Sequence, residues 1–129
     1  MAIGYRQMLE EAEAEVRSVS TEEGALLRAQ AEVVFIDIRD PRELAREGMI
    51  PGAHRAPRGM LEFWIDPESP YHKPYFAEDK LFVFYCASGW RSLLAAQVAQ
   101  RMGLRCASLT GGFGDWRRAG QEVAAPEAY

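Results

Sequence analysis

The feature that most constrains the fold is a buried strand pattern that leads, through a short connection, into a helix pattern. Residues 81–85 are all apolar or aromatic, and a continuous run of this kind is typical of a strand that is buried on both faces. After the connection, Leu94, Val98 and Met102 recur every four residues, which predicts an amphipathic helix with this stripe turned inward. A strand followed directly by a helix is the repeating unit of parallel sheets, so we expect an α/β protein.

The connection itself begins with a cysteine. Cys86 follows the strand, and small, turn-forming residues separate it from the helix. Loop amides and the helix dipole favour negative charge at such a place, and Arg91 adds a fixed cation. A buried and inert cysteine is the alternative, but that reading suits a cysteine inside a strand better than one after it. We therefore predict that Cys86 is a nucleophilic thiolate.

Strand and helix patterns alternate along the rest of the chain. Strands are predicted at Val19 and over residues 33–38, 53–55, 81–85 and 105–109. Helices are predicted over residues 4–17, 20–30 and 40–47, and after the Cys86 connection. Ser20 with Glu23 has the spacing of a capping box, and Asp40 before Pro41 has the pattern of a helix start. The pattern predicts about five strands in a mainly parallel sheet with helices on both faces.

The length of 129 residues fits one main domain. We expect an N-terminal amphipathic helix within residues 1–18, the domain over residues 19–124 and a tail over residues 125–129. Packing of this helix on its own domain is favoured over packing on a second copy.

Residues 57–80 are the least regular stretch, because four prolines interrupt a segment rich in aromatic residues. Residues 60–65 have a helical pattern. We consider two interpretations of the stretch: an apolar cluster folded under a long loop, or a lid that shapes access to the Cys86 loop.

Three segments of the chain together resemble the rhodanese family. Residues 35–43 with 48–53 resemble the family's opening signature, residues 86–91 resemble its active-site loop, and residues 111–113 with Trp116 resemble its closing segment. They occur in the family's order over about residues 19–124. The family usually has histidine where this chain has Met49, at a position that resembles a structural turn.

The resemblance implies a rhodanese-like three-layer sandwich and a sulfurtransferase. Cys86 would take a sulfur atom from a small anionic donor such as thiosulfate and hold it as a persulfide. The acceptor would be cyanide or a thiol, carried by a small molecule or by a protein. No cofactor and no metal are implied. The predicted binding loop comprises Ala87, Ser88, Gly89, Trp90, Arg91 and Ser92.

Two other functions stay open, namely a phosphatase or arsenate reductase on the same fold and a non-catalytic interaction module. The spacing in the loop favours sulfur transfer. Four residues separate Cys86 from Arg91, whereas phosphatases that resemble this fold have five at this point. Ser92 stands at the sixth position after the cysteine and cannot supply the cation that a phosphate needs there.

Other chemically active residues receive structural interpretations. Asp37, Arg39 and Glu43 are expected to form an ion-pair lattice, with a catalytic acid as the less favoured reading. Cys106 lies in a strand pattern and is expected to be a buried small residue, with a redox role as the minor alternative. His54 and His72 have no ligand at metal-binding spacing, so we predict no metal site.

Composition excludes several classes of partner. The net charge of −4, without a lysine–arginine cluster, gives no footprint for nucleic acid or an anionic membrane. The apolar runs are too short for a membrane span, and the first residues lack a signal core, so we expect a cytoplasmic location. Two cysteines twenty positions apart do not make a disulfide framework. The sequence does not determine the oligomeric state.

Overall fold

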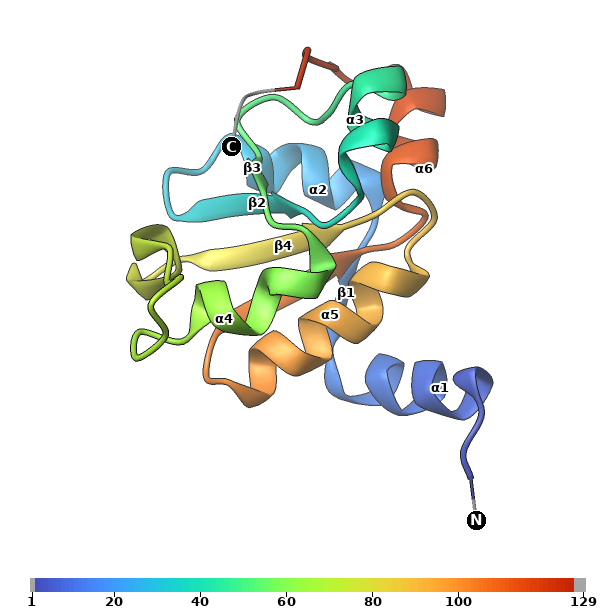
Figure 1. Cartoon of the computed structure of the whole chain (residues 1–129). Helices are drawn as coiled ribbons and strands as arrows, with labels where there is room; N and C mark the ends of the chain where they lie inside the picture. The colour runs from blue at the N-terminus through green and yellow to red at the C-terminus, as the bar shows by residue number, and fades with distance from the viewer. Residues whose placement is uncertain (1, 127–129) are drawn as a thin grey trace.

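Five parallel strands form one sheet with β4 at its centre (Figure 1). The strands are β1 (Arg17–Val19), β2 (Val33–Asp37), β3 (His54–Arg55), β4 (Leu81–Tyr85) and β5 (Arg105–Leu109), in the order β1-β5-β4-β2-β3. This is a computed structural model, and it describes residues 2–126. The sequence predicted the five strands and their mainly parallel pairing, and the structure confirms both.

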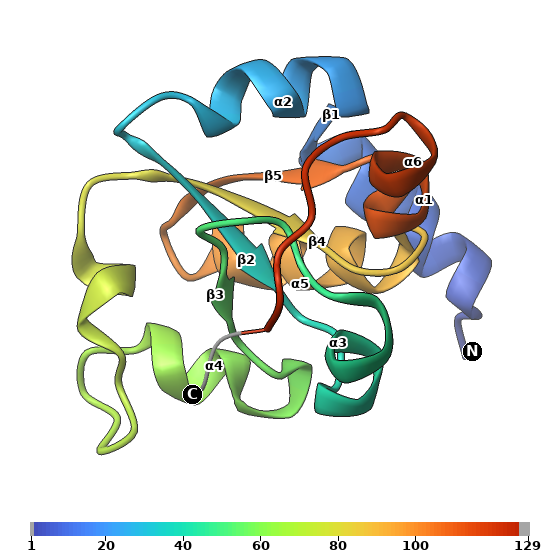
Figure 2. The ribbon, with the colours of Figure 1, turned by 90° about the horizontal axis from the view of Figure 1, so that it is seen from above.

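Helices cover both faces of the sheet and complete the predicted three layers (Figures 1 and 2). One face carries α2 (Thr21–Arg28), α3 (Pro41–Glu47) and α6 (Gly112–Arg118). The other carries α4 (Leu61–Ile65) and α5 (Trp90–Arg101), with α1 (Tyr5–Glu15) packed outside α5. Two 3-10 turns, η1 (Arg58–Met60) and η2 (Pro74–Ala77), lie between β3 and β4. No helix within residues 2–126 has both the length and the apolar character needed to cross a bilayer.

The sheet separates two hydrophobic clusters, as the alternation of strand side chains requires. Phe82 and Phe84 of β4 belong to the cluster beneath α4 and α5, and Cys86 continues this series. Val83 and Tyr85 belong to the cluster beneath α2, α3 and α6. Because every side chain of β4 is buried, the cysteine that follows is placed rigidly at the carboxyl end of the central strand.

The buried face of α5 lies to one side of the predicted stripe of Leu94, Val98 and Met102, on the alanines beside it. Its fully buried aliphatic residues are Ala95, Ala96 and Ala99, whereas Met102 is 37% exposed. Leu94 and Val98 are only partly buried. Small side chains let the helix lie close against β4 and β5, so the larger apolar residues are displaced to its flanks.

Both predicted helix starts exist, but one capping box is incomplete. Asp40 and Glu43 form the reciprocal box at α3. At α2, Ser20 accepts the hydrogen bond from the Glu23 amide, while the Glu23 carboxylate pairs with Arg17 instead of returning to the cap. That ion pair ties α2 to edge strand β1.

The segment over residues 66–80 leads into the amino end of β4, at the opposite end of the sheet from Cys86 (Figure 1). Phe76 is buried in the cluster beneath α5, and Pro67 lines a pocket together with Leu104, the residue just before β5. The structure therefore supports the apolar-cluster interpretation, and the lid interpretation is wrong for this part of the stretch. The tail predicted over residues 125–129 lies mostly outside the described residues.

Candidate active site

Cys86 lies inside a tight loop that turns from β4 into α5. Its sulfur accepts a hydrogen bond from the Gly89 amide at 3.1 Å and lies 3.6 Å from the Ser92 hydroxyl. Gly89 has φ +107°, a conformation that a side chain would strain, and this turn aims its amide at the sulfur. The cysteine is 1% exposed, so the sulfur is held at the base of the loop with the Gly89 amide already directed at it.

The turn into α6 fixes the other side of the loop. The Phe113 amide donates to the Cys86 carbonyl at 2.8 Å, and the Gly114 amide donates to the Ala87 carbonyl at 3.0 Å. Gly112 lies so close that a Cβ there would be 2.4 Å from the Cys86 carbonyl oxygen. The segment that resembles the family's closing signature therefore serves as the brace of the cysteine loop.

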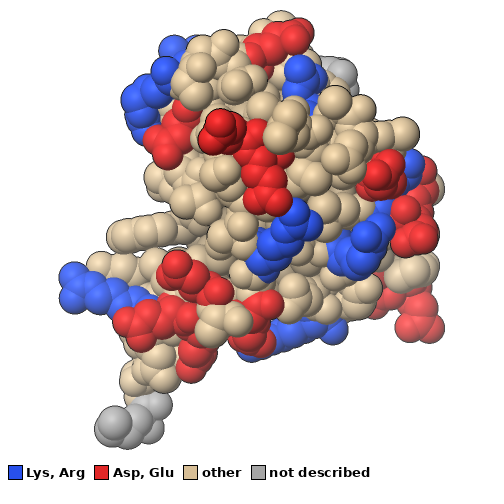
Figure 3. All heavy atoms as spheres, turned by 180° about the vertical axis from the view of Figure 1, so that it is seen from behind, with Lys and Arg blue, Asp and Glu red and all other residues tan. Residues whose placement is uncertain are grey.

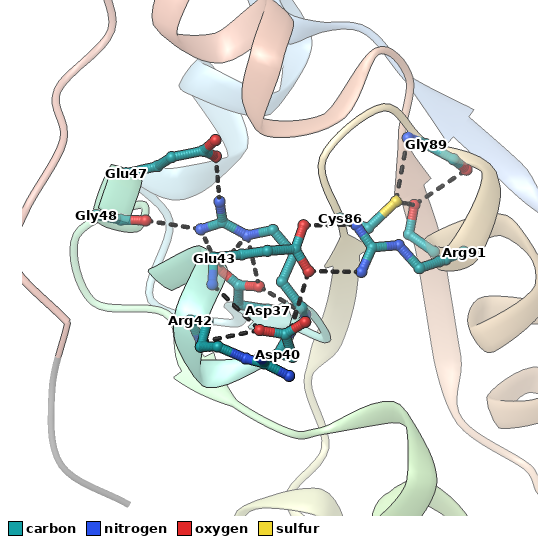
Figure 4. Close-up of polar contacts among 11 residues, drawn as sticks. Asp37, Asp40, Arg42, Glu43, Glu47, Gly48, Cys86, Gly89 and Arg91 are labelled. Atoms are coloured by element: carbon teal, nitrogen blue, oxygen red, sulfur yellow. Dashed lines mark hydrogen bonds and ion pairs between the residues drawn. The ribbon is translucent and has the colours of Figure 1, made fainter. Parts of the chain in front are cut away.

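Arg91 does not stand as a free cation beside the cysteine. Its guanidinium donates two hydrogen bonds of 2.8 Å to the two oxygens of Glu43 on α3 (Figure 4). The Arg91 hydrogen bond lowers the pKa of Glu43 to about 2, against the opposing effect of burial. The same bond raises the pKa of Arg91, and the nearby Cys86 adds to this effect. The pair joins the cysteine loop to α3.

The expected ion-pair lattice exists without Glu43. Arg39, which is fully buried, binds both oxygens of Asp37 and also pairs with Glu47 at 3.1 Å. It donates to the Gly48 carbonyl at 2.7 Å as well. This network braces the corner between β2 and the end of α3 (Figure 4). Glu43 belongs instead to the loop through Arg91, which corrects the prediction for that residue.

Ser92 does not cap α5. Gly89 occupies the N-cap of α5, and the buried Ser92 side chain turns toward the sulfur. Its hydroxyl lies 2.9 Å from that of Ser108 on β5 and 3.2 Å from the Gly89 carbonyl. The sequence analysis missed Ser108. The feature that could have indicated it is a polar residue within an otherwise apolar strand pattern; in the structure this residue lies opposite Phe84 of β4.

The outer side of the loop borders a cleft of about 280 Å³ beside α1. Ser88 and the 59%-exposed Trp90 line it, and Trp90 also contacts the Tyr5 ring at a centroid distance of 5.5 Å. Two carboxylates, those of Glu10 and Glu13, line the opposite wall. In Figure 3 acidic side chains gather over α1 at the lower left, and the surface above them is hollowed.

The remaining predicted residues lie apart from this site. Cys106 is buried in β5, and burial raises the pKa of its thiol to about 12. His54 stacks on Tyr75, and His72 bonds to the Trp64 carbonyl. Over residues 2–126, the structure contains no group of three or more His, Cys, Asp or Glu residues that could hold a metal ion.

With this geometry established, comparison with known proteins identifies the family. The model of the rhodanese-like domain matches residues 20–119, which span the whole sheet except β1 together with the cysteine loop and its α6 brace. The chain belongs to the rhodanese-like family.

Individual relatives of this rhodanese-like protein carry two kinds of name. Human thiosulfate:glutathione sulfurtransferase is 32% identical over 106 residues, which cover 77% of this chain and 91% of the human protein. A thiosulfate sulfurtransferase structure from Pseudomonas aeruginosa is 29% identical with a TM-score of 0.75, covering 96% of this chain and 23% of that one. A Rhodopseudomonas palustris structure is 52% identical with a TM-score of 0.93 and covers 96% of each chain; it is described as a protein of unknown function and a possible tyrosine phosphatase.

Proposed function

We propose that this rhodanese-like protein transfers a sulfane sulfur from a small anionic donor to a thiol, through a persulfide on Cys86. The observation that carries the proposal is the six-residue loop from Cys86 to Arg91, which directs the Gly89 amide at the sulfur. The sulfurtransferase relatives support the reaction class, and the name of the human relative supports thiosulfate as donor and a small thiol as acceptor.

The reaction divides into two displacements at sulfur. The Cys86 thiolate attacks the outer sulfur of thiosulfate, an S–S bond forms, and sulfite leaves with the electron pair of the broken S–S bond. An acceptor thiolate then attacks the outer sulfur of the persulfide, which releases the Cys86 thiolate and a new persulfide. The proton of the acceptor thiol passes to solvent. The amides of the loop stabilise the negative terminal sulfur.

We also propose that Arg91 draws the donor anion to the mouth of the loop. Two of its N–H groups are used by Glu43, but a guanidinium has five, and the side chain is 46% exposed. Glu43 orients the guanidinium and at the same time weakens its positive field. The attraction is therefore smaller than that of an unpaired arginine.

A tyrosine phosphatase is the second candidate, because of the description of the Rhodopseudomonas palustris structure. The loop argues against it. The sixth residue after the cysteine is Ser92, whose hydroxyl is buried against Cys86 and Ser108, so no arginine is available at that position to bind a phosphate.

One experiment separates these functions. The intact mass of the protein is measured after incubation with thiosulfate, for the wild type and for Cys86→Ser, and hydrolysis of an aryl phosphate is measured in parallel. We expect the wild type to gain the mass of one sulfur atom, the variant to gain nothing, and neither to hydrolyse the phosphate. Rapid phosphate hydrolysis without a sulfur adduct would overturn the proposal in favour of the phosphatase.

A further inference from the structure

We propose that Ser108 is a positioning residue for Cys86, that it acts through the Ser92 hydroxyl, and that these two hydroxyls carry the thiol proton to the cleft beside α1. The inference rests on the proposed function and adds a residue from a different strand to the same site.

The contacts form a continuous chain from sulfur to cleft. The Cys86 sulfur lies 3.6 Å from the Ser92 hydroxyl, which lies 2.9 Å from the Ser108 hydroxyl. Ser108 lines the cleft of about 280 Å³ described above, together with Ser88 and Gly89 of the cysteine loop. The buried sulfur is thus connected to the cleft by two hydrogen bonds.

Burial makes these hydroxyls dependent on each other. Ser92 is 0% exposed and Ser108 is 3% exposed, and a buried hydroxyl without a partner is costly. Within residues 2–126, the Ser108 hydroxyl forms its side-chain hydrogen bond with Ser92. Its strand neighbours Ala107 and Leu109 point to the cluster on the opposite face of the sheet, so Ser108 lies on the same face as Cys106 and α5.

A hydroxyl both donates and accepts, so the chain can serve both charge states of the sulfur. When Cys86 is a thiol, its S–H donates to Ser92, and Ser92 donates to Ser108 or to the Gly89 carbonyl. When Cys86 is a thiolate, all donors reverse: Ser108 donates to Ser92, and Ser92 donates to the sulfur beside the Gly89 amide. Without Ser108, Ser92 loses the donor that holds its own proton toward the sulfur and is freer to turn to the Gly89 carbonyl.

The change of state moves one proton and no electrons. The S–H bond breaks, its proton binds the Ser92 oxygen, the former Ser92 proton binds the Ser108 oxygen, and the former Ser108 proton passes to water in the cleft. Each serine ends with one proton, and the sulfur keeps the electron pair that attacks the donor.

Charged groups around the cysteine loop and its cleft lie on four helices. Arg91 of α5 faces it and is paired with Glu43 of α3, with Asp40 nearby. Glu10 and Glu13 of α1 line the far wall of the cleft, and Asp115 and Arg118 of α6 form their own ion pair. None of these groups touches the Ser92–Ser108 pair by a recorded hydrogen bond, so a serine substitution tests the hydroxyl chain itself.

The test is the rate of Cys86 alkylation by iodoacetamide from pH 5 to pH 10, with the labelled cysteine identified by peptide mass. The variants are Ser108→Ala, Ser92→Ala, the double variant, and Ser18→Ala as control. Ser18 pairs with Ser108 in the sheet and lines the same cleft, but it lies outside the hydroxyl chain. We expect Ser108→Ala to move the pH–rate profile to higher pH and to slow alkylation at pH 7 about 3- to 10-fold, as loss of support for a charged hydrogen bond would.

The double variant tests the route. If Ser108 acts through Ser92, then Ser108→Ala should slow Cys86 alkylation by less than about 2-fold in a protein that already carries Ser92→Ala, because the effects of coupled residues are not additive. Ser18→Ala should keep the wild-type profile. An unchanged profile for Ser108→Ala, or full additivity with Ser92→Ala, would overturn the inference.

Two further comparisons keep the result interpretable. Ser108→Thr and Ser108→Val have nearly the same shape, and only the first keeps a hydroxyl, so we expect the threonine variant to be nearer the wild type even if both lose stability. Equal profiles for this pair would contradict the inference. If the wild type gains no sulfur from thiosulfate, the proposed function fails; if it gains sulfur while the serine variants keep the wild-type alkylation profile, only the Ser108 inference fails.

Discussion

Cys86 and Cys106 occupy opposite ends of neighbouring strands, and this difference of position sets their chemistry. Cys86 follows the carboxyl end of β4, where the Gly89 amide donates to its sulfur. Cys106 lies near the amino end of β5 and contacts the Ala96 and Leu104 carbonyls, which cannot stabilise a thiolate. The Cys86 sulfur lies beside an amide donor and a hydroxyl, whereas the Cys106 sulfur lies beside two carbonyl acceptors.

We therefore predict selective alkylation of the folded protein. Iodoacetamide at pH 8 should modify Cys86 at least about 10-fold faster than Cys106, because burial raises the pKa of Cys106 to about 12 and leaves almost no thiolate there. Peptide mass spectrometry over time measures both rates, and labelling in denaturant serves as control. Equal rates in the folded state would contradict the assignment of Cys86 as nucleophile.

The charge on Glu43 should make the free energy of unfolding depend on pH in the acid range. The pKa of Glu43 is lowered from 4.5 to about 2 in the folded protein, so its stabilising effect is present above pH 4.5 and is lost as the pH falls toward 2. Glu43→Gln should lower the free energy of unfolding by about 2 kcal/mol at pH 7, after allowance for solvent screening, and by less at pH 3. Urea unfolding at both pH values measures this. Glu22→Gln, in the first turn of α2, is the matched control. If Glu43→Gln lowers the free energy of unfolding equally at both pH values, the charge of Glu43 is not the cause of the loss.

The same pair offers a test of the role of Arg91 toward the donor. Arg91→Ala should raise the KM for thiosulfate about 5-fold, since it removes a half-exposed cation, and should lower the free energy of unfolding about as much as Glu43→Gln does, since it breaks the same pair. Glu43→Gln keeps a hydrogen-bond acceptor for Arg91 but removes the countercharge, so it should lower that KM about 2- to 3-fold. Steady-state kinetics with cyanide as acceptor gives both values. A rise in KM for both variants would show that Arg91 acts as a tether between the loop and α3 rather than as an anion-attracting charge.

At the scale of elements, the site depends on contacts between segments that the chain keeps far apart. The order of strand, cysteine loop and helix could be predicted, because hydrophobic periodicity and turn residues are local signals. The pairing of Glu43 with Arg91 and the approach of Ser108 to Ser92 could not, since each joins two elements whose relative placement only packing decides. Helix α6 was missed for a related reason: it is seven residues long and begins with glycine, so its local propensity is weak.

The α6 turn should be sensitive to a single added methyl group. Gly112→Ala would place a Cβ 2.4 Å from the Cys86 carbonyl at a φ of +57°, so we expect a loss of about 3 kcal/mol or more and a displaced cysteine loop. Gly120→Ala is the matched control, because φ there is also positive, at +76°, but no atom lies within 4 Å of the added Cβ. Its cost should be only about 1 kcal/mol. For Gly112→Ala, both the free energy of unfolding in urea and the fraction of protein that gains sulfur from thiosulfate should fall. Similar values for Gly112→Ala and Gly120→Ala would show that the brace at Gly112 is unimportant.

For the whole molecule, α1, like β1, lies outside the region that matches the family. The matched region begins at residue 20, after α1 has ended. Helix α1 packs on the outer face of α5. Ala12 is fully buried in this contact, and the Glu15 backbone carbonyl accepts a hydrogen bond from Gln100 at 2.9 Å. The Cys86 sulfur accepts a hydrogen bond from the Gly89 amide, and the Cys86 thiol donates one to the Ser92 hydroxyl. We infer that α1 forms a wall of the neighbouring cleft without supporting the nucleophile directly.

This division of roles predicts that α1 can be undocked while the nucleophile survives. Ala12→Asp would bury an unpaired charge against α5, so α1 should detach. The free energy of unfolding should fall by about 3 kcal/mol, and the helical circular dichroism signal should also decrease. Ala14→Asp makes the same substitution two residues away on the exposed side of α1, and its cost should stay within about 0.5 kcal/mol. At 20 °C both variants should still gain one sulfur atom from thiosulfate, because the Gly89 amide and the Ser92 hydroxyl remain beside the Cys86 sulfur. If the Ala12→Asp variant keeps its sheet but no longer takes up sulfur, then α1 is itself part of the catalytic site.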